Sequence, residues 1–131
     1  MSKRLPVLLL SGLFCLAGGS NLATAGERIA SEVLVVAGGA HGSFGSARNS
    51  SDSDQFMYCS VAVYGNGPAT ATCGAGGADG NVGYCVTSNN ILVQAAAALK
   101  TDSYILLQWH DNGECYVVSA SNGSLAVPKA P

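Results

Sequence analysis

The sequence predicts a mainly β fold, a small disulfide-bonded antiparallel sandwich or barrel that includes one short helix. Three observations lead to this prediction. Short segments of alternating or β-branched residues recur about every 10–12 residues. Turns rich in Gly and Asn separate these segments. Four cysteines, an even number, fall in the same region, as in small exported domains that are cross-linked by disulfides.

The first 25 residues have the pattern of a secretory signal peptide. Lys3 and Arg4 precede an apolar stretch from Leu5 to Ala17, and an A-x-A cleavage motif ends at Ala25. We expect cleavage after Ala25, so that residues 26–131 form a single secreted or periplasmic domain. A retained membrane anchor is the alternative, but the apolar stretch is shorter than the roughly 18 residues that a membrane-spanning helix needs.

Charge is scarce along the chain, and its balance is acidic. Charged residues make up 11% of the 131 residues, against roughly 25% in an average soluble domain. After removal of residues 1–25, four basic and eight acidic residues remain, which gives a net charge of −4. This balance argues against nucleic acid or acidic lipid as a partner. We expect an unidentified protein or small ligand as the partner, and no cofactor.

Seven segments are predicted to be strands. Residues 29–37 contain the β-branched run Val33 to Val36, and residues 55–64 alternate between two faces and include three aromatic side chains. A turn at Asn66 and Gly67 follows. The other predicted strands are residues 69–73, 82–87, 104–109, 114–120 and 125–127. Between them, residues 74–81 are expected to form a Gly-rich connection, and residues 110–113 a hairpin turn.

Residues 91–100 break the strand pattern and predict the one short helix. Ala and Leu are strong helix formers, and the apolar residues recur at helical spacing, namely Ile91, Leu92, Ala95, Ala96 and Leu99. Ser88, Asn89 or Asn90 is available as the N-cap. We expect this helix to lie across the sheet. A further strand in this place is the alternative.

The four cysteines of the secreted domain are predicted to form two disulfides: they are Cys59, Cys73, Cys85 and Cys115. Among the three possible pairings, we favour Cys59–Cys73 with Cys85–Cys115, because a hairpin around Asn66 places the first pair nearly opposite each other. A zinc site is the alternative. It lacks a C-x-x-C pair, and the spacings of 14, 12 and 30 residues are too wide for a zinc finger or ribbon.

Catalytic and metal-binding candidates are few. The histidines are His41 and His110, and the nucleophile-elbow pattern G-x-S-x-G is absent from the sequence. A metal site of His41, His110 and Asp111 would require the fold to bring their loops together. The acidic run at Asp52 begins like a calcium loop, but Phe56 breaks the EF-hand order. We therefore expect no catalytic residue and no metal ligand.

Residues 38–54 are predicted to be a long loop and the candidate binding segment. Long loops without regular structure often carry binding residues, and the candidates here are His41, Phe44, Arg48 and Asn49. An arginine can hold a carboxylate or phosphate through two parallel hydrogen bonds. The alternative for Arg48 is an internal ion pair with Asp52 or Asp54.

The tyrosines and the single tryptophan are expected to fill the core of this small β domain. Trp109 has the strongest case, because it follows the apolar run Ile105 to Leu107. The alternative is an exposed aromatic platform for a sugar or a protein. The residues concerned are Tyr58, Tyr64, Tyr84, Tyr104, Tyr116 and Trp109.

Four short motifs follow one another along the chain: Ala47-Arg48-Asn49-Ser50, Gln108-Trp109, Gly113-x-Cys115 and Pro128-Lys129. In this order the chain resembles a group of small exported bacterial proteins of uncharacterised function. The resemblance spans most of residues 26–131. It implies a small exported disulfide-bonded domain, and it implies no activity.

The sequence therefore predicts a small secreted or periplasmic domain that acts by binding or as a structural component, and not as an enzyme. One alternative is an inhibitor of an exported hydrolase, a protease or a lysozyme, that presents a rigid loop from residues 38–54 or 74–81. An unrecognised hydrolase is the second alternative. In that case substitution of His41 or His110 would abolish a catalytic activity.

Overall fold

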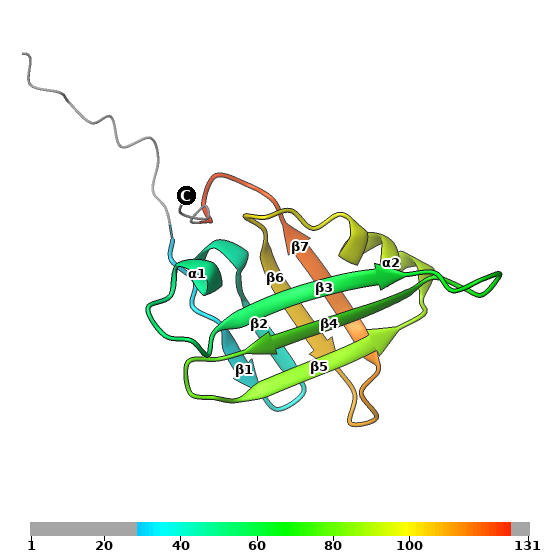
Figure 1. Ribbon diagram of the computed structural model, residues 1–131, viewed down its shortest axis with the longest axis horizontal. Helices are drawn as coiled ribbons and strands as arrows, with labels where there is room; N and C mark the ends of the chain where they lie inside the picture. Colours follow the sequence, from blue (N-terminus) through cyan, green and yellow to red (C-terminus); the bar gives the residue numbers. More distant parts are fainter. Residues whose placement is uncertain (1–28, 127–131) are drawn as a thin grey trace, which may run out of the picture.

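Two antiparallel sheets pack face to face, and their strands cross (Figure 1). The computed structural model describes residues 29–126. One sheet has four strands in the order β1-β2-β6-β7, and the other has three in the order β3-β4-β5. The elements are β1 (Leu34–Val36), β2 (Gly39–Ser43), α1 (Phe44–Asn49), β3 (Phe56–Ala62), β4 (Thr70–Gly76), β5 (Val82–Thr87), α2 (Asn90–Ala97), β6 (Tyr104–Trp109) and β7 (Cys115–Ser121). The predicted mainly β, sandwich-like fold is confirmed, and the sheets do not close into a barrel.

The core lies between the two sheets. Ile105 and Leu107, on the inner face of β6, have no exposed surface. They belong to one apolar cluster with Ala71 and Ala75, on the inner face of β4. Small side chains on β4 leave room for the larger ones of β6, so the two sheets approach closely.

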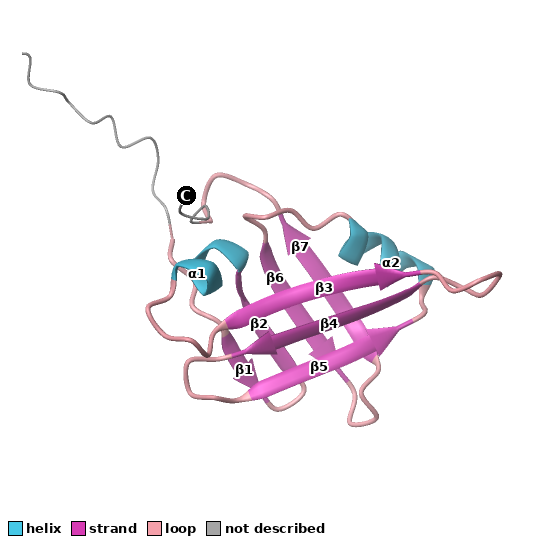
Figure 2. Cartoon of the chain, in the orientation of Figure 1, coloured by secondary structure: helices cyan, strands magenta, loops and turns pink. Residues whose placement is uncertain are grey.

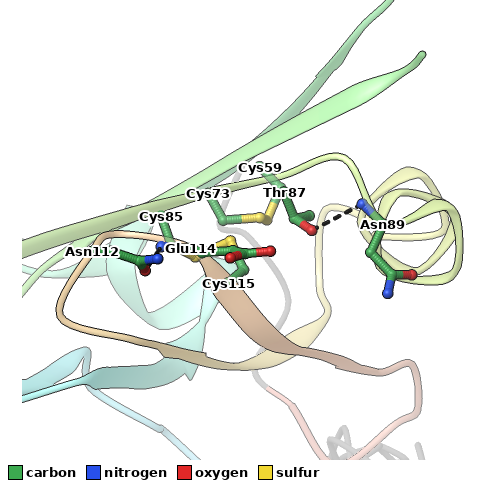
Figure 3. Close-up of a disulfide and its surroundings, with 8 residues drawn as sticks. All are labelled: Cys59, Cys73, Cys85, Thr87, Asn89, Asn112, Glu114 and Cys115. Atoms are coloured by element: carbon green, nitrogen blue, oxygen red, sulfur yellow. Dashed lines mark hydrogen bonds between the residues drawn. A yellow bond between two sulfur atoms is a disulfide. The ribbon is translucent and has the colours of Figure 1, made fainter.

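Both predicted disulfides are present, with the favoured pairing. Cys59–Cys73 joins the neighbouring strands β3 and β4, and its Cα atoms are 4.0 Å apart. Cys85–Cys115 joins β5 to β7, across the two sheets, with Cα atoms 5.1 Å apart. The two bridges lie close together between the sheets (Figure 3). They fit a protein of an oxidising compartment, outside the cell or in the periplasm.

The predicted helix is confirmed as α2. The Asn89 side chain caps it, because Oδ1 accepts a hydrogen bond of 3.0 Å from the Ile91 N–H. Thr87 Oγ1 in turn accepts a 3.1 Å bond from the Asn89 N–H and so fixes the cap to the end of β5 (Figure 3). No helix within residues 29–126 is long and apolar enough to cross a membrane.

The prediction of a long loop over residues 38–54 is wrong. Residues 39–43 form β2, which pairs with β1 and β6, and residues 44–49 form α1, a second helix. Ser43 caps α1, since its Oγ accepts a 3.1 Å hydrogen bond from the Ser46 N–H. Other boundaries differ as well. The strand predicted over residues 29–37 is reduced to β1, and β4 continues to Gly76 into the predicted connection. Residues 125–126 contribute only an isolated bridge, between Ala126 and Ile29. Residue 127 lies outside the described residues, as does the predicted signal peptide.

The expectation that the tyrosines fill the core is wrong for Tyr58, Tyr64, Tyr84 and Tyr116, which are all exposed. The outer face of the three-stranded sheet explains the exposure of Tyr58 and of the neighbouring Phe56. Phe56 and Tyr58 of β3 lie opposite Gly76 and Gly74 of β4. Their rings cover these glycines so closely that a Cβ at Gly74 would lie 2.6 Å from Tyr58 Cε1. Tyr104 and Trp109 are half-buried, and Trp109 packs against the core.

Candidate functional site

A cavity of about 700 Å³ opens along the outer edge of β3. Its walls come from α1 and from α2 with the residues that follow it, and these helices lie near opposite ends of β3 (Figure 2). Its size is in the range that holds a small ligand or a short peptide. The lining residues include Phe44, Ala47 and Arg48 from α1, Met57, Cys59 and Val61 from β3, and Ala96, Leu99 and Lys100 from α2 and the loop after it.

The short helix α1 is held by its cap and by burial. Ser43 is fully buried, and its Oγ donates a 2.8 Å hydrogen bond to Ser46 Oγ. Ala47 is buried in the core cluster, and Phe44 packs against it. These contacts fix one face of the helix, so the neighbouring Arg48 is exposed at the cavity wall.

The loop after α2 holds Lys100 through its backbone. The Lys100 N–H donates a 2.8 Å hydrogen bond to Ser103 Oγ, and the Ser103 N–H donates a 3.0 Å bond to the Lys100 carbonyl. Ser103 is fully buried, and its hydroxyl also bonds the Asn122 side chain. The backbone of Lys100 is thus anchored while its side chain is exposed at the cavity.

Gln55 lines the end of the cavity near α1, and Asp52 holds it in place. The Gln55 side-chain amide donates a 2.7 Å hydrogen bond to Asp52 Oδ2, and the Gln55 N–H donates 2.8 Å to Oδ1. These two bonds, the side-chain one foremost, lower the pKa of Asp52 below its ordinary value of 3.8. Gln55 Oε1 also accepts a 2.9 Å bond from the Val33 N–H, so the loop is tied to the segment before β1.

The alternative expectation of an ion pair from Arg48 to Asp52 or Asp54 is wrong. Within residues 29–126, neither Arg48 nor Lys100 forms an ion pair with a carboxylate. Asp52 is instead occupied by Gln55 and by the Asp54 N–H. The Arg48 guanidinium and the Lys100 ammonium at the cavity therefore keep hydrogen-bond donors available for a ligand.

The charge distribution singles out this cavity. Residues 29–126 contain two basic and seven acidic side chains. Both basic side chains, Arg48 and Lys100, line the cavity, and none of the acidic ones does. A site of local positive charge thus lies on an acidic molecule, and it attracts anions.

The structure separates the predicted binding residues. Phe44 and Arg48 line the cavity. Asn49 ends α1 and is exposed. His41 lies in β2 instead, where its Nδ1 is 3.1 Å from the Tyr104 hydroxyl oxygen. Sequence reasoning missed Lys100 and the edge of β3. The one signal for Lys100 was its position as the last residue of the predicted helix.

Other parts of the described chain offer less. A smaller cavity of about 380 Å³ lies between residues 29–31 and 121–126. His110 stacks on Tyr116 with ring centroids 4.5 Å apart. Between Ile29 and Ala126, no three His, Cys, Asp or Glu side chains gather in a group that could hold a metal ion, so His41, His110 and Asp111 do not form the site considered above.

Comparison of the chain with protein-family models, with curated proteins and with solved structures found no match. The cavity beside β3 therefore stands on its own geometry as the candidate site.

Proposed function

We propose that this protein is an exported binding protein that holds an anionic ligand in the cavity between α1, β3 and α2. The observation that carries the proposal is the position of Arg48 and Lys100. They are the two basic side chains of residues 29–126, both line this cavity, and neither is paired with a carboxylate there.

The chemistry of the two side chains defines the class of ligand. Guanidinium and ammonium groups only donate hydrogen bonds, so they suit a carboxylate, a sulfonate or a phosphate. Apolar side chains, Met57 and Leu99 among them, make up much of the remaining wall. The favoured ligand thus combines an acidic group with an apolar part.

Export rests on two observations of different kinds. The sequence has the signal-peptide pattern with cleavage after Ala25, and the two disulfides fit an oxidising compartment. The resemblance to small exported bacterial proteins agrees with this assignment and stays a prediction. Action by binding, without catalysis, is part of the same proposal.

The inhibitor alternative depended on a rigid exposed loop at residues 38–54 or 74–81. The first of these segments is folded as β2 and α1, and the second begins inside β4. No observation favours an inhibitory loop over the cavity, so we keep ligand binding as the single proposed function.

A matched pair of fluorescent probes tests the proposal. Anilinonaphthalene sulfonate is anionic, and phenylnaphthylamine is a neutral compound of similar shape. We expect Arg48→Gln and Lys100→Gln each to weaken the sulfonate about 2- to 5-fold, and the double variant to weaken it about 4- to 25-fold. Binding of the neutral probe should stay within about 2-fold.

Asn112→Asp is the matched control for net charge. It adds one negative charge at the exposed turn between β6 and β7, away from the cavity lining, and Asp retains the oxygen that accepts from the Glu114 N–H. This variant should bind both probes as the unchanged protein does. Equal weakening of both probes in the Gln variants, or no sulfonate binding at all, would overturn the proposed function.

A further inference from the structure

The outer edge of β3 is open among the described residues. The three-stranded sheet has the order β3-β4-β5, so β3 and β5 are its two edges. The turn between β6 and β7 covers part of the β5 edge, since the Val86 N–H donates a 3.0 Å hydrogen bond to the Gly113 carbonyl. No described strand pairs with the other edge of β3, and the cavity lies along that edge.

The register shows which backbone groups of β3 face the open edge. In antiparallel pairs, opposite residues without mutual hydrogen bonds have the shorter Cα separation, about 4.5 Å against 5.5 Å. The Cys59–Cys73 separation of 4.0 Å marks such a pair. The N–H and C=O of Cys59 therefore point away from β4, as do those of Met57 and Val61, two residues to either side.

Hydrogen bonding at the other edge of the sheet, along β5, supports this assignment of the outward-pointing backbone groups. If the backbone groups of Cys73 point toward β5, then Cys85 pairs with it and Val86 points outward. The Val86 N–H does donate outward, to Gly113. This bond on β5 independently supports the orientation of the backbone groups deduced for β3.

We propose that the ligand is an acidic peptide in extended conformation, which pairs with the open edge of β3 as an added strand. This inference rests on the proposed function. A small anion would satisfy Arg48 and Lys100 but would leave the edge backbone of β3 without a partner. A peptide strand satisfies both, through backbone hydrogen bonds to Met57, Cys59 and Val61 and through its carboxylates.

The length of the cavity fits a short peptide. Its β3 wall extends from Gln55 to Val61, which corresponds to about 20 Å at roughly 3.3 Å per residue. Six residues of added strand cover this length. Their side chains alternate, so one set lies over Ala47 and Leu99 in the cavity, and the other extends the outer face beside Phe56 and Tyr58.

A peptide panel tests the inference. We propose capped hexapeptides in which Val and Thr alternate and a single Glu occupies each position in turn. The best member should bind with a Kd below about 1 mM. Its Gln counterpart should bind about 2- to 5-fold more weakly, and Arg48→Gln with Lys100→Gln should abolish that difference.

Backbone N-methylation of the peptide separates strand pairing from other modes, and it leaves the protein unchanged. Methylation at one alternate set of residues removes the N–H groups that face β3. It should weaken binding at least about 10-fold, whereas methylation of the other set should change it less than about 2-fold. Amide hydrogen exchange should show new protection at Met57, Cys59 and Val61 only.

The outcomes are distinguishable. Sulfonate-probe binding without any peptide binding would overturn this inference and leave the proposed function standing. Equal effects of the two methylation sets would exclude edge pairing. Protection of the same three amides in the free protein at high concentration, with dimer formation, would assign the edge to a second copy. Equal affinity for the Glu and Gln peptides would exclude acidic recognition.

Discussion

At the scale of single residues, the hydrogen bonds of Gln55 fix the cavity wall near α1. Gln55 connects Asp52 to the Val33 backbone through three hydrogen bonds of 2.7–2.9 Å. Asp52 is therefore engaged by its own loop and does not neutralise Arg48. The availability of the Arg48 guanidinium for a ligand depends on this arrangement.

The first prediction concerns the pKa of Asp52. Its pKa in the folded protein lies below 3.8, so ionised Asp52 stabilises the fold above pH 3.8, and this contribution is lost as the pH falls through the folded pKa. Gln55→Ala should raise the pKa of Asp52 toward 3.8. A carboxyl titration followed by NMR measures it, and an unchanged midpoint in the variant would contradict the assignment.

The second prediction concerns the contact between Trp109 and Gly83. A Cβ at Gly83 would lie 2.5 Å from Trp109 Cζ2 and 3.4 Å from Val35 Cγ1. Gly83→Ala should lower the free energy of unfolding by about 1–3 kcal/mol, as measured by urea denaturation. Gly123→Ala is the control, because nothing lies within 4 Å of its Cβ position. Similar values for the two variants would refute this packing.

At the scale of elements, β3 is flanked by α1 and α2 and has one paired and one open edge. This difference between its edges gives a stability test that needs no ligand. The N–H of Ser60 faces β4, opposite Thr72, whereas that of Val61 faces the cavity.

Proline substitution distinguishes the two sides of β3. Ser60→Pro removes a ladder hydrogen bond and should cost about 3 kcal/mol or more, whereas Val61→Pro removes none and should cost clearly less. The measurement is the unfolding midpoint in urea with an unchanged m-value. A larger loss of stability for Val61→Pro than for Ser60→Pro would show that the N–H of Val61 faces β4. It would remove the basis for edge pairing.

Strands with strong alternation and the Ala-rich helix could be predicted from the sequence, because period and propensity are local properties. Helix α1 could not, since the intrinsic preferences of its residues, which include Gly, Ser and Asn, do not favour a helix. It forms because Ser43 caps it and Ala47 is buried. The cap is local, but the burial of Ala47 depends on core residues from distant parts of the chain.

The exposed aromatic residues illustrate a second limit. Alternation over residues 56–60 correctly placed Phe56 and Tyr58 on one face, but it does not say which face points inward. That depended on Cys59 and Met57, which face the core, and on the glycines of β4 beneath the rings. Of the two basic residues of the cavity, the sequence pointed only to Arg48, because tertiary packing is what places Lys100 along the same cavity.

For the whole molecule, the two disulfides differ in what they connect. Cys59–Cys73 closes a hairpin of sequence separation 14 within one sheet, and Cys85–Cys115 joins the two sheets at a separation of 30. The sheets otherwise hold together through the apolar core and the turn that reaches β5.

Removal of each bridge should therefore have a different cost. The loop-entropy relation gives about 3 kcal/mol for Cys59→Ala with Cys73→Ala and about 3.6 kcal/mol for Cys85→Ala with Cys115→Ala. Thermal unfolding of both double variants measures the difference. If the variant without Cys59–Cys73 is less stable than the one without Cys85–Cys115, the bridge between the sheets is not the more stabilising of the two.

The position of ligand binding on the whole molecule is the central claim. A two-dimensional NMR titration with anilinonaphthalene sulfonate tests it most directly. We predict amide shift changes centred on Arg48, Met57 and Lys100, which disappear in the double Gln variant. Shift changes confined to the smaller cavity near Leu125, or to the outer face around Tyr84, would contradict the claim.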